Sequence, residues 1–336
     1  MPRFPISLTK QIVPVVCNTN MKILVTPTSL KPDSTSPALQ KLRSFASALV
    51  FNPTGKYLSE DELIPLLADC DGCVAGLDHF TAKVFANAPD LKVVSRYGVG
   101  VDQVDLAAAR AHSIVVCNTP GVNSQAVADL TFALILCLAR KLPTLDRKTR
   151  EGQWPRSIGM ELYGKTLGIL GLGAAGRAVA QRAGGFSMKV IAYSPHIDKQ
   201  YAESKGIVAT DFDTVIRESD ILTLHCPLTD STRHFISADV MKAMKKGAIL
   251  INTARGGIVD EAAACELLAS GHLRGMGMDV YETEPPQNSP LLALENVVLT
   301  PHTGSHTAEA TEAMASMSVQ NLIDVLSGRD CPHIVP

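Results

Sequence analysis

The sequence predicts an α/β protein with two domains, each built on a parallel sheet. From Met21 onward, short β-rich runs alternate with helical stretches, a pattern typical of parallel strands joined by crossover helices. A second series of such runs begins at Leu167 and is richer in Val, Ile and Leu, as expected for strands covered on both faces. The chain has 336 residues, 46% of them hydrophobic, which is enough for two hydrophobic cores.

The first series predicts four strands and the second predicts six. The runs of the first series are KILVTP, GCVAGL, LKVVSRYG and SIVVCNTP, with helices expected over 36–49, 61–68 and 104–111. The runs of the second series are TLGILGLG, MKVIAYSP, DILTLHCP, GAILINTA, GMGMDV and NVVLTPH. Between the two series, a long and largely apolar helix is expected over 123–142. It is predicted to cross from one domain to the other.

The end of the chain predicts that the first domain is split in the sequence. A helical pattern over 307–326 is stopped by Gly328 and is expected to pack back on the first domain. The first domain is therefore expected to comprise residues 21–120 and 303–336, with residues 121–302 inserted as the second. Residues 1–20 precede the first strand and are expected to be an N-terminal extension.

Composition argues against several classes of protein. The formal net charge is −2, so the chain lacks the excess of basic residues that is typical of proteins that bind nucleic acid or an anionic membrane. The most apolar stretch, 130–139, is only half of the about 20 residues that span a bilayer. Eight irregularly spaced cysteines do not resemble a disulfide framework, and the lone CxxC of Cys70 and Cys73 has no second pair to complete a metal site. We therefore expect a cytoplasmic protein with no metal, membrane or nucleic-acid partner.

A glycine-rich turn predicts a dinucleotide site. GLGAAG follows the strand expected over 166–170 and opens a helix over 177–183. In this context Gly171 permits the tight turn, Gly173 lets the backbone approach a pyrophosphate, and Gly176 allows close packing of helix and strand. The helix N-terminus then offers free N–H groups to the phosphates.

The next strand end leaves the choice between NAD and NADP open. That strand should end in an acid that binds the adenine ribose of NAD, but here it ends in Ser194, followed by Pro195 and His196. Ser194 can bond to a ribose hydroxyl and does not repel a 2′-phosphate. No Arg follows to bind that phosphate; His196 or Lys199 could bind it, or both could be solvated loop residues.

Three residues late in the chain describe a hydride-transfer reaction on a small acid. Arg255, in NTARGG, can donate from its planar guanidinium to both the carboxylate and the carbonyl of a 2-keto acid. His302, in LTPHTGSH, can deliver a proton to the carbonyl oxygen near neutral pH. Glu284, in DVYETEPP, can orient that imidazole and favour its charged form.

These motifs resemble the signatures of the D-isomer-specific 2-hydroxyacid dehydrogenases. The resemblance rests on GLGAAGR, HCPLTDSTRHFI, MKKGAILINTARGGIVDE, GMDVYETEPP and LTPHTGSHT, which follow one another in order, and it extends from about Met21 to the end. It implies two Rossmann-like domains, with a nucleotide domain inserted into a split, flavodoxin-like substrate domain. It also implies NAD or NADP as the cofactor, a small 2-keto or 2-hydroxy acid as the substrate, and a homodimer.

The resemblance assigns roles to individual positions. Arg255 matches the substrate-binding Arg, His302 the acid/base and Glu284 its partner. The backbone of Tyr97, Gly98, Val99 and Gly100 matches a loop that holds the substrate carboxylate, and Asp279 is expected near the nicotinamide carboxamide. The other positions expected to line the cofactor are Ala174, Ala175, Cys226, Pro227, Thr253, Ala254 and Gly304.

One departure bears on the substrate. Within the family, the sequence most resembles D-3-phosphoglycerate dehydrogenases and hydroxypyruvate or glyoxylate reductases. In the phosphoglycerate dehydrogenases, one loop carries a basic residue. The corresponding residues here, 75–78, include no basic residue and end in Asp78. Arg96 could replace the missing cation. We therefore expect glyoxylate or hydroxypyruvate, with 3-phosphohydroxypyruvate as the alternative. Trp154, in EGQW, also matches the family and is expected to be a packing anchor.

Two rival functions fit the same fold. A nucleotide-sensing co-repressor would resemble this chain even at the catalytic residues, although such proteins carry long disordered tails that are not evident here. A formate dehydrogenase would have Gln in place of Glu284. Neither rival accounts for the chain as well as a dehydrogenase of small D-2-hydroxy acids does.

Overall fold

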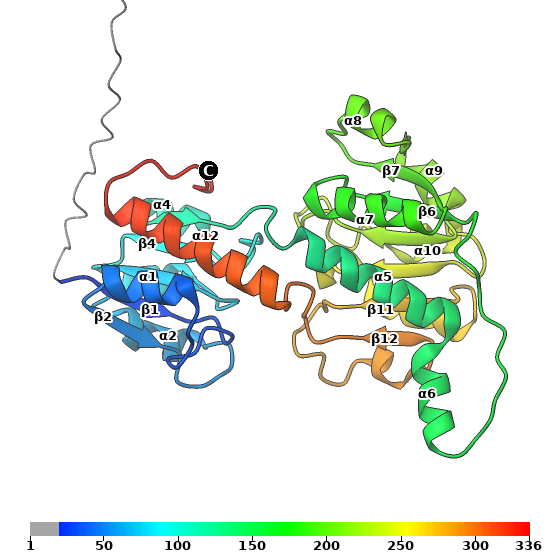
Figure 1. Ribbon diagram of the computed structural model, residues 1–336, viewed down its shortest axis with the longest axis horizontal. Helices are drawn as coiled ribbons and strands as arrows, with labels where there is room; N and C mark the ends of the chain where they lie inside the picture. Colours follow the sequence, from blue (N-terminus) through cyan, green and yellow to red (C-terminus); the bar gives the residue numbers. More distant parts are fainter. Residues whose placement is uncertain (1–19) are drawn as a thin grey trace, which may run out of the picture. The chain divides into compact units, whose positions relative to one another are not determined.

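The computed structural model describes residues 20–336, and these form two compact units (Figure 1). Unit 1 comprises the described residues up to Tyr97, then Gln103–Asn118 and Ala315–Pro336. Unit 2 comprises Gly98–Asp102 and Thr119–Met314. The domain limits expected above stay a prediction, and the proposed extension lies almost wholly outside the described residues.

Unit 1 is built on a five-stranded parallel sheet in the order β2-β1-β3-β4-β5. This is the flavodoxin-like order, as the sequence predicted. The strands are β1 (Lys22–Val25), β2 (Ala48–Phe51), β3 (Gly72–Ala75), β4 (Val93–Arg96) and β5 (Val115–Cys117). The sequence missed β2 because it extended the first helix to residue 49. That helix ends at Phe45, and the next residues turn back to pair with β1.

Two helices that are far apart in the sequence cover the same face of this sheet (Figure 1). They are α1 (Pro37–Phe45) and α12 (Ala308–Leu326), whose residues Leu39, Leu42, Val319 and Leu322 are fully buried in one core. The return of α12 to this sheet is the split that the sequence predicted. The remaining helices are α2 (Glu60–Leu67), α3 (Ala82–Ala86) and α4 (Leu106–Ala111).

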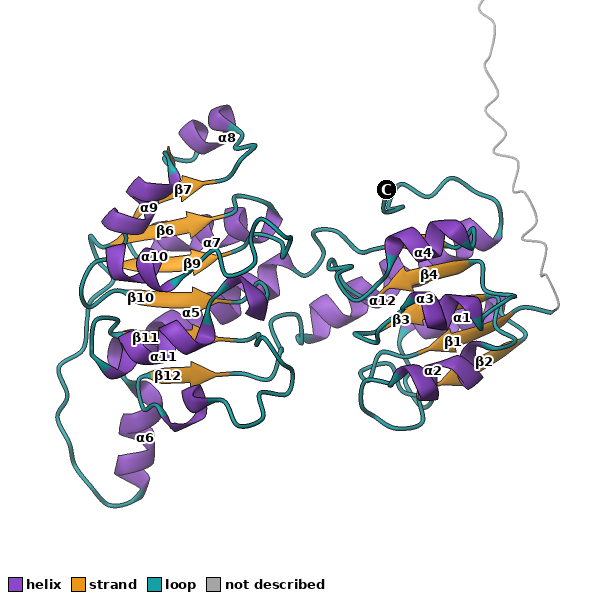
Figure 2. Ribbon diagram, turned by 180° about the vertical axis from the view of Figure 1, so that it is seen from behind, coloured by secondary structure: helices purple, strands orange, loops and turns teal. Residues whose placement is uncertain are grey.

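Unit 2 is built on a seven-stranded parallel sheet in the order β12-β11-β10-β9-β6-β7-β8 (Figure 2). The order reverses between β6 and β9, as in dinucleotide-binding folds. The strands are β6 (Thr166–Leu170), β7 (Lys189–Tyr193), β8 (Val208–Ala209), β9 (Ile221–Leu224), β10 (Ile249–Asn252), β11 (Gly275–Met278) and β12 (Val297–Leu299). Only the two-residue edge strand β8 was not predicted, because it is too short to give an alternating pattern.

Helices cover both faces of the unit 2 sheet, with a core under each layer. Figure 1 shows α5 (Ser124–Arg140) and α7 (Ala174–Gly185) on one face. On the other face, Figure 2 shows α9 (Phe212–Glu218), α10 (Ala238–Ala243) and α11 (Glu261–Ala269). Two further helices, α6 (Leu142–Arg150) and α8 (Lys199–Ser204), lie at the borders of the sheet.

Helix α5 does not cross between the units, contrary to the prediction for 123–142. It lies wholly in unit 2: the chain enters this unit between Asn118 and Thr119, before the helix begins, and returns to unit 1 within α12. Its apolar surface is explained by the glycines of β11: a Cβ at Gly275 would lie 2.9 Å from Leu138 Cδ2, and one at Gly277 would lie 3.0 Å from Leu134 Cβ. The absence of side chains there lets α5 approach the sheet closely. Within residues 20–336, no helix combines the length and apolarity that a bilayer crossing requires.

Candidate active site

The expected site residues of unit 2 gather at one edge of its sheet. Gly171 follows β6, Ser194 follows β7, Thr253 follows β10, and Asp279 follows β11 directly. Cys226, Pro227 and His302 come within three residues of the ends of β9 and β12. Because neighbouring parallel strands end at the same edge, these segments of distant sequence lie along one edge of the sheet, on both sides of the switch between β6 and β9.

The glycine-rich turn has the geometry that a pyrophosphate requires. A Cβ at Gly171, whose φ is +97°, would lie 2.6 Å from the carbonyl carbon of His225, and one at Gly176 would lie 2.1 Å from the carbonyl oxygen of Gly171. Gly173 caps α7 without any side-chain hydrogen bond, and nothing lies within 4 Å of the position its Cβ would take. The start of α7 at Ala174 and Ala175 therefore faces open space, which fits a dinucleotide phosphate group.

The other expected cofactor positions differ in how their side chains are used. Ser194 is half-buried, and its carbonyl accepts a hydrogen bond from the Ile197 N–H at 3.2 Å. Burial raises the pKa of the Cys226 thiol to about 11, so this thiol is neutral near pH 7. The Thr253 hydroxyl lies 3.1 Å from the Thr131 hydroxyl of α5, and the Ala254 N–H donates to Asn252 Oδ1 at 3.1 Å. Thr253 and Ala254 therefore present backbone rather than a free side-chain donor.

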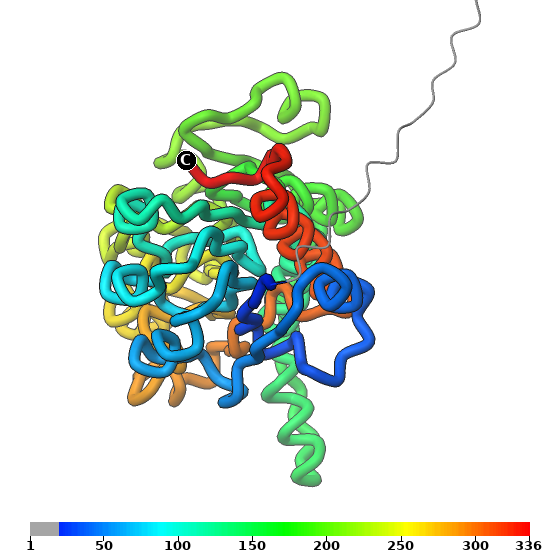
Figure 3. Tube along the Cα trace, turned by 90° about the vertical axis from the view of Figure 1, so that its left-hand side faces the viewer, coloured from blue at the N-terminus to red at the C-terminus, as the bar shows by residue number. Residues whose placement is uncertain are grey.

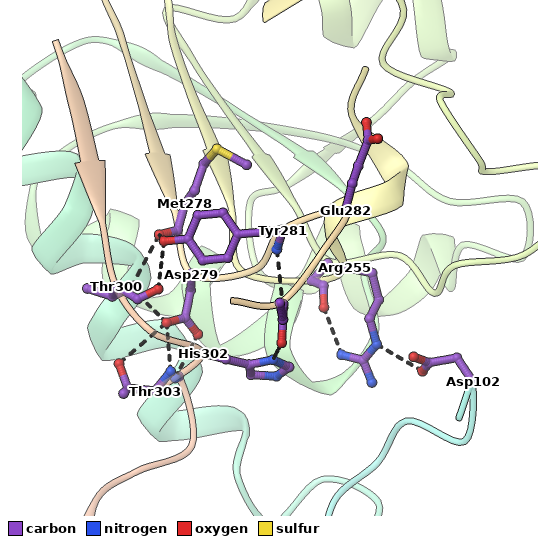
Figure 4. Close-up of polar contacts among 12 residues, drawn as sticks. Asp102, Arg255, Met278, Asp279, Tyr281, Glu282, Thr300, His302 and Thr303 are labelled. Atoms are coloured by element: carbon purple, nitrogen blue, oxygen red, sulfur yellow. Dashed lines mark hydrogen bonds and ion pairs between the residues drawn. The ribbon is translucent and has the colours of Figure 1, made fainter. Parts of the chain in front are cut away.

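His302 and Glu284 form a direct pair (Figure 4). His302 Nδ1 lies 2.7 Å from Glu284 Oε2, and Glu284 Oε1 accepts a hydrogen bond from the Tyr281 N–H at 3.1 Å. The two side chains are 21% and 25% exposed, so the pair is sheltered but open to a small molecule. His302 has a φ of +52°, which is unusual for a residue with a side chain and requires support from its surroundings.

Asp279 supplies that support. Its carboxylate is buried and accepts hydrogen bonds from the Thr300 hydroxyl, the Thr303 N–H and the Gly304 N–H, each at 2.7 Å (Figure 4). A Cβ at Gly304 would lie 2.9 Å from Asp279 Oδ2, so only glycine fits there without displacement. The carboxylate expected at the nicotinamide carboxamide is thus largely engaged in fixing the loop that holds His302.

Arg255 is held by residues of the 98–102 segment. Its Nε donates to Asp102 Oδ1 at 2.9 Å, and its Nη1 donates to the Ala254 carbonyl at 2.8 Å (Figure 4). A Cβ at Gly100 would lie only 1.5 Å from Nη2, so the guanidinium rests against the bare backbone of Gly100. No role for Asp102 was expected from the sequence; its place two residues after the Gly98–Gly100 loop was the available signal.

The loops of Arg255 and Glu284 are in backbone contact. A Cβ at Gly256 would lie 1.8 Å from the carbonyl carbon of Tyr281, so the residue after Arg255 must lack a side chain. Beyond this point, the Glu282 N–H donates to Glu261 Oε1 at 2.7 Å, which anchors the segment to the start of α11. Glycine at 256 thus brings the Arg255 turn against the segment that leads to Glu284.

The expected substrate loop is divided between the two units. Tyr97 belongs to unit 1, and its hydroxyl accepts a hydrogen bond from Ser29 at 3.1 Å. Gly98, Val99 and Gly100 belong to unit 2, where the Gly98 carbonyl accepts a hydrogen bond from the Thr119 N–H at 3.0 Å.

Arg96 and Asp78, the two residues expected to influence binding of a substrate phosphate, are both buried. Arg96 is 1% exposed and donates to the Ala75 carbonyl at 3.0 Å. Asp78 is also 1% exposed, and it accepts from the Leu58 N–H at 2.7 Å and from the Thr26 hydroxyl. Burial raises the pKa of Asp78 despite the opposing effects of these hydrogen bonds and of Arg96. Neither the Arg96 guanidinium nor the Asp78 carboxylate therefore faces solvent in this structure.

Trp154 does not anchor packing within its own chain. Its side chain is 81% exposed, in the segment that follows α6. The prediction of a packing anchor is therefore wrong for the isolated chain. The cause is that no element of residues 20–336 folds over this segment.

The chain is similar to known proteins over most of its length. Residues 132–304 match the family model of the D-isomer specific 2-hydroxyacid dehydrogenase NAD-binding domain. The chain is 42% identical over 282 residues to a D-3-phosphoglycerate dehydrogenase of Methanocaldococcus jannaschii, covering 83% of this chain and 54% of that protein. It is 44% identical over 267 residues to a glyoxylate reductase of Thermococcus litoralis, covering 77% of this chain and 81% of the relative.

A solved structure agrees with these similarities. The TT0316 protein of Thermus thermophilus superposes with a TM-score of 0.84 at 38% identity, covering 94% of this chain and all of the other. The chain belongs to the D-isomer specific 2-hydroxyacid dehydrogenase family and is a nicotinamide-dependent oxidoreductase of CH–OH groups.

Proposed function

We propose that the protein reduces a small 2-keto acid, glyoxylate or hydroxypyruvate, to the corresponding 2-hydroxy acid, which has the D configuration where the product is chiral. The observation that supports this most directly is the sheltered His302–Glu284 pair on a loop that Asp279 fixes, with the Glu284 segment in contact with the turn of Arg255. An acid, its carboxylate partner and a guanidinium are the groups that ketone reduction next to a carboxylate needs.

Each of these side chains has a definable task. Arg255 binds the substrate carboxylate through its Nη groups, because its Nε is directed at Asp102. His302 donates a proton from Nε2 to the carbonyl oxygen, since Nδ1 is directed at Glu284. Glu284 holds the ring in orientation and stabilises the imidazolium. When bound, the reduced nicotinamide supplies the hydride that the carbonyl carbon receives.

The open space at the start of α7 supports an assignment of the cofactor-binding residues. We assign the pyrophosphate to Gly171, Gly173 and Gly176 with the backbone of Ala174 and Ala175. Ser194 is assigned to the adenine ribose. The positions assigned to the rest of the dinucleotide are Cys226, Pro227, Thr253, Ala254, Asp279 and Gly304.

The buried state of Arg96 favours an uncharged third carbon in the substrate. Arg96 is buried inside unit 1, and residues 75–78 include no basic residue. This segment therefore offers no positive charge to neutralise a substrate phosphate. The similarity to a D-3-phosphoglycerate dehydrogenase keeps the phosphorylated substrate as the second candidate. Values of kcat/KM for glyoxylate, hydroxypyruvate and 3-phosphohydroxypyruvate decide between them. A clear preference for the phosphorylated acid would overturn the proposal.

We also propose a homodimer formed through unit 2, in the reducing conditions of the cytoplasm. The apolar residues of α5 do not argue for a dimer, because that helix packs on its own sheet. The support comes instead from the segment after α6, where Trp154, Ile158 and Tyr163 are 81%, 90% and 76% exposed. Figure 3 shows α6, which leads into this segment, projecting from its unit. A hollow of about 630 Å³ lined by Leu136, Arg140, Phe186 and residues 159–163 lies beside it, and a second copy would cover the exposed side chains of Trp154, Ile158 and Tyr163. Cytoplasmic conditions fit the seven cysteines of residues 20–336, which are all free thiols.

A further inference from the structure

Arg177 joins the glycine-rich turn to the loop after β7. It is the first residue after GLGAAG, and its Nε donates to the Leu172 carbonyl within that turn at 3.2 Å. Its Nη2 lies 3.5 Å from Asp198 Oδ2, at the far end of the loop that begins with Ser194. Its guanidinium also stacks on Tyr201, with Cζ 3.8 Å from the ring centroid. A cation of α7 thus lies beside the loop that follows β7.

This position corresponds to the adenosine half of a dinucleotide. In folds of this kind the pyrophosphate lies on the glycine-rich turn, and the 2′ position of the adenine ribose lies at the end of the following strand. Arg177 contacts the segments that define both places. With Ser194 in place of an acid, no carboxylate from the strand end itself would repel a charged group on the ribose.

The contacts of Arg177 leave its positive charge available to bind a further anion. The distance of 3.5 Å to Asp198 is at the long end for a hydrogen bond, and the side chains are 37% and 51% exposed, so the ion pair is weak. The other oxygen of Asp198 caps α8 by accepting from the Tyr201 N–H at 2.9 Å, which keeps this carboxylate in place. The Tyr201 ring fixes the plane of the guanidinium, and a planar guanidinium matches two phosphate oxygens.

We propose that Arg177 is the residue that receives the 2′-phosphate of NADP, in exchange for its contact with Asp198. The proposal rests on the dinucleotide site proposed above. Arg177 then decides how well NADPH is used relative to NADH, while Asp198 limits that use by competing for the same guanidinium.

Binding of two nucleotides that lack nicotinamide tests this without turnover. Calorimetry compares adenosine 2′,5′-bisphosphate with AMP on the intact protein, the Arg177→Gln variant, and Arg217→Gln. Arg217 is an exposed arginine of α9 in the same unit, so its variant carries the same loss of charge. We expect Arg177→Gln to weaken the bisphosphate about tenfold relative to AMP, the usual effect of losing one charge-assisted hydrogen bond, and Arg217→Gln to leave that ratio unchanged.

A second variant tests the competition on an intact Arg177. Asp198→Asn keeps an N-cap residue on α8 but removes the charge, so it should strengthen bisphosphate binding several-fold relative to AMP. The same shifts should appear in the ratio of kcat/KM for NADPH and NADH. If Arg177→Gln weakens both nucleotides equally, or neither, the assignment is overturned. Failure of AMP and NADH to bind the unaltered protein would instead reject the dinucleotide site itself.

Discussion

Nδ1 of His302 lies 2.7 Å from Oε2 of Glu284, and the carboxylate is oriented from its other side by the Tyr281 N–H. This arrangement leaves Nε2 as the ring nitrogen for a substrate. Glu284 is the carboxylate that contacts the ring, so its replacement can be tested separately from replacement of His302.

Replacing His302 by Ala should reduce kcat by about 10²–10⁴-fold, the usual contribution of a general acid. Glu284→Gln should leave a weaker enzyme, because an amide keeps a hydrogen bond but does not stabilise an imidazolium. The rate of reduction in Glu284→Gln should therefore fall away at a lower pH than in the parent. His306→Ala, at an exposed histidine of the same loop, is the control. An unchanged pH profile for Glu284→Gln would reject the pairing.

Asp102→Asn should raise KM for the keto acid three- to tenfold, with a smaller effect on kcat, because a partly exposed ion pair contributes about 1 kcal/mol. The physical reason is that Asp102 fixes Nε of Arg255 at 2.9 Å and so orients the Nη groups. Steady-state kinetics measures this, and NADH binding should stay unchanged. Asp90→Asn, at an exposed loop residue of unit 1, serves as the control. Equal losses of NADH affinity and keto-acid affinity would indicate a general structural effect instead.

Gly100→Ala should lower kcat/KM by at least about a hundredfold, as expected when a substrate-binding group is displaced by an ångström or more. The new Cβ would lie 1.5 Å from Nη2 of Arg255, so the guanidinium has to move. Gly184→Ala provides the comparison, because nothing lies within 4 Å of its Cβ position. Activity of Gly100→Ala close to that of Gly184→Ala would show that Arg255 does not need this position.

Cofactor preference should be moderate. With Ser194 at the end of β7, we expect kcat/KM for NADPH to be no more than about a hundredfold below that for NADH, or roughly 2.7 kcal/mol. Ser194→Asp should shift the ratio toward NADH by repelling the 2′-phosphate, while Ser204→Asp, on the exposed side of α8, should not. Strict use of NADH by the unaltered protein would mean that another residue rejects the phosphate.

Trp154 offers a direct probe of assembly, since it is the only tryptophan in the chain. It is 81% exposed in one copy, so dimer formation should bury it and shift its fluorescence to shorter wavelength as protein concentration rises. Light scattering should give the mass of two chains at micromolar concentration, and Trp154→Ala should weaken the dimer. A monomer at these concentrations would contradict the proposal.

Most strands of the two sheets and the candidate catalytic residues could be predicted from the amino-acid sequence. Ten of the strands could be read from apolar runs, and GLGAAG, Arg255, Glu284 and His302 could be recognised, because each depends on local pattern or on the chemistry of one side chain.

The partners of these residues could be learned only from the folded chain. Asp102 lies 153 positions before Arg255, and Arg177 meets Asp198 only because α7 passes beside the loop after β7. Burial likewise decided that Arg96 and Asp78 lie inside unit 1 and that α5 covers a glycine-bearing strand rather than crossing between units. Such facts depend on close approach between distant backbones, and the pattern of a single segment does not contain that information.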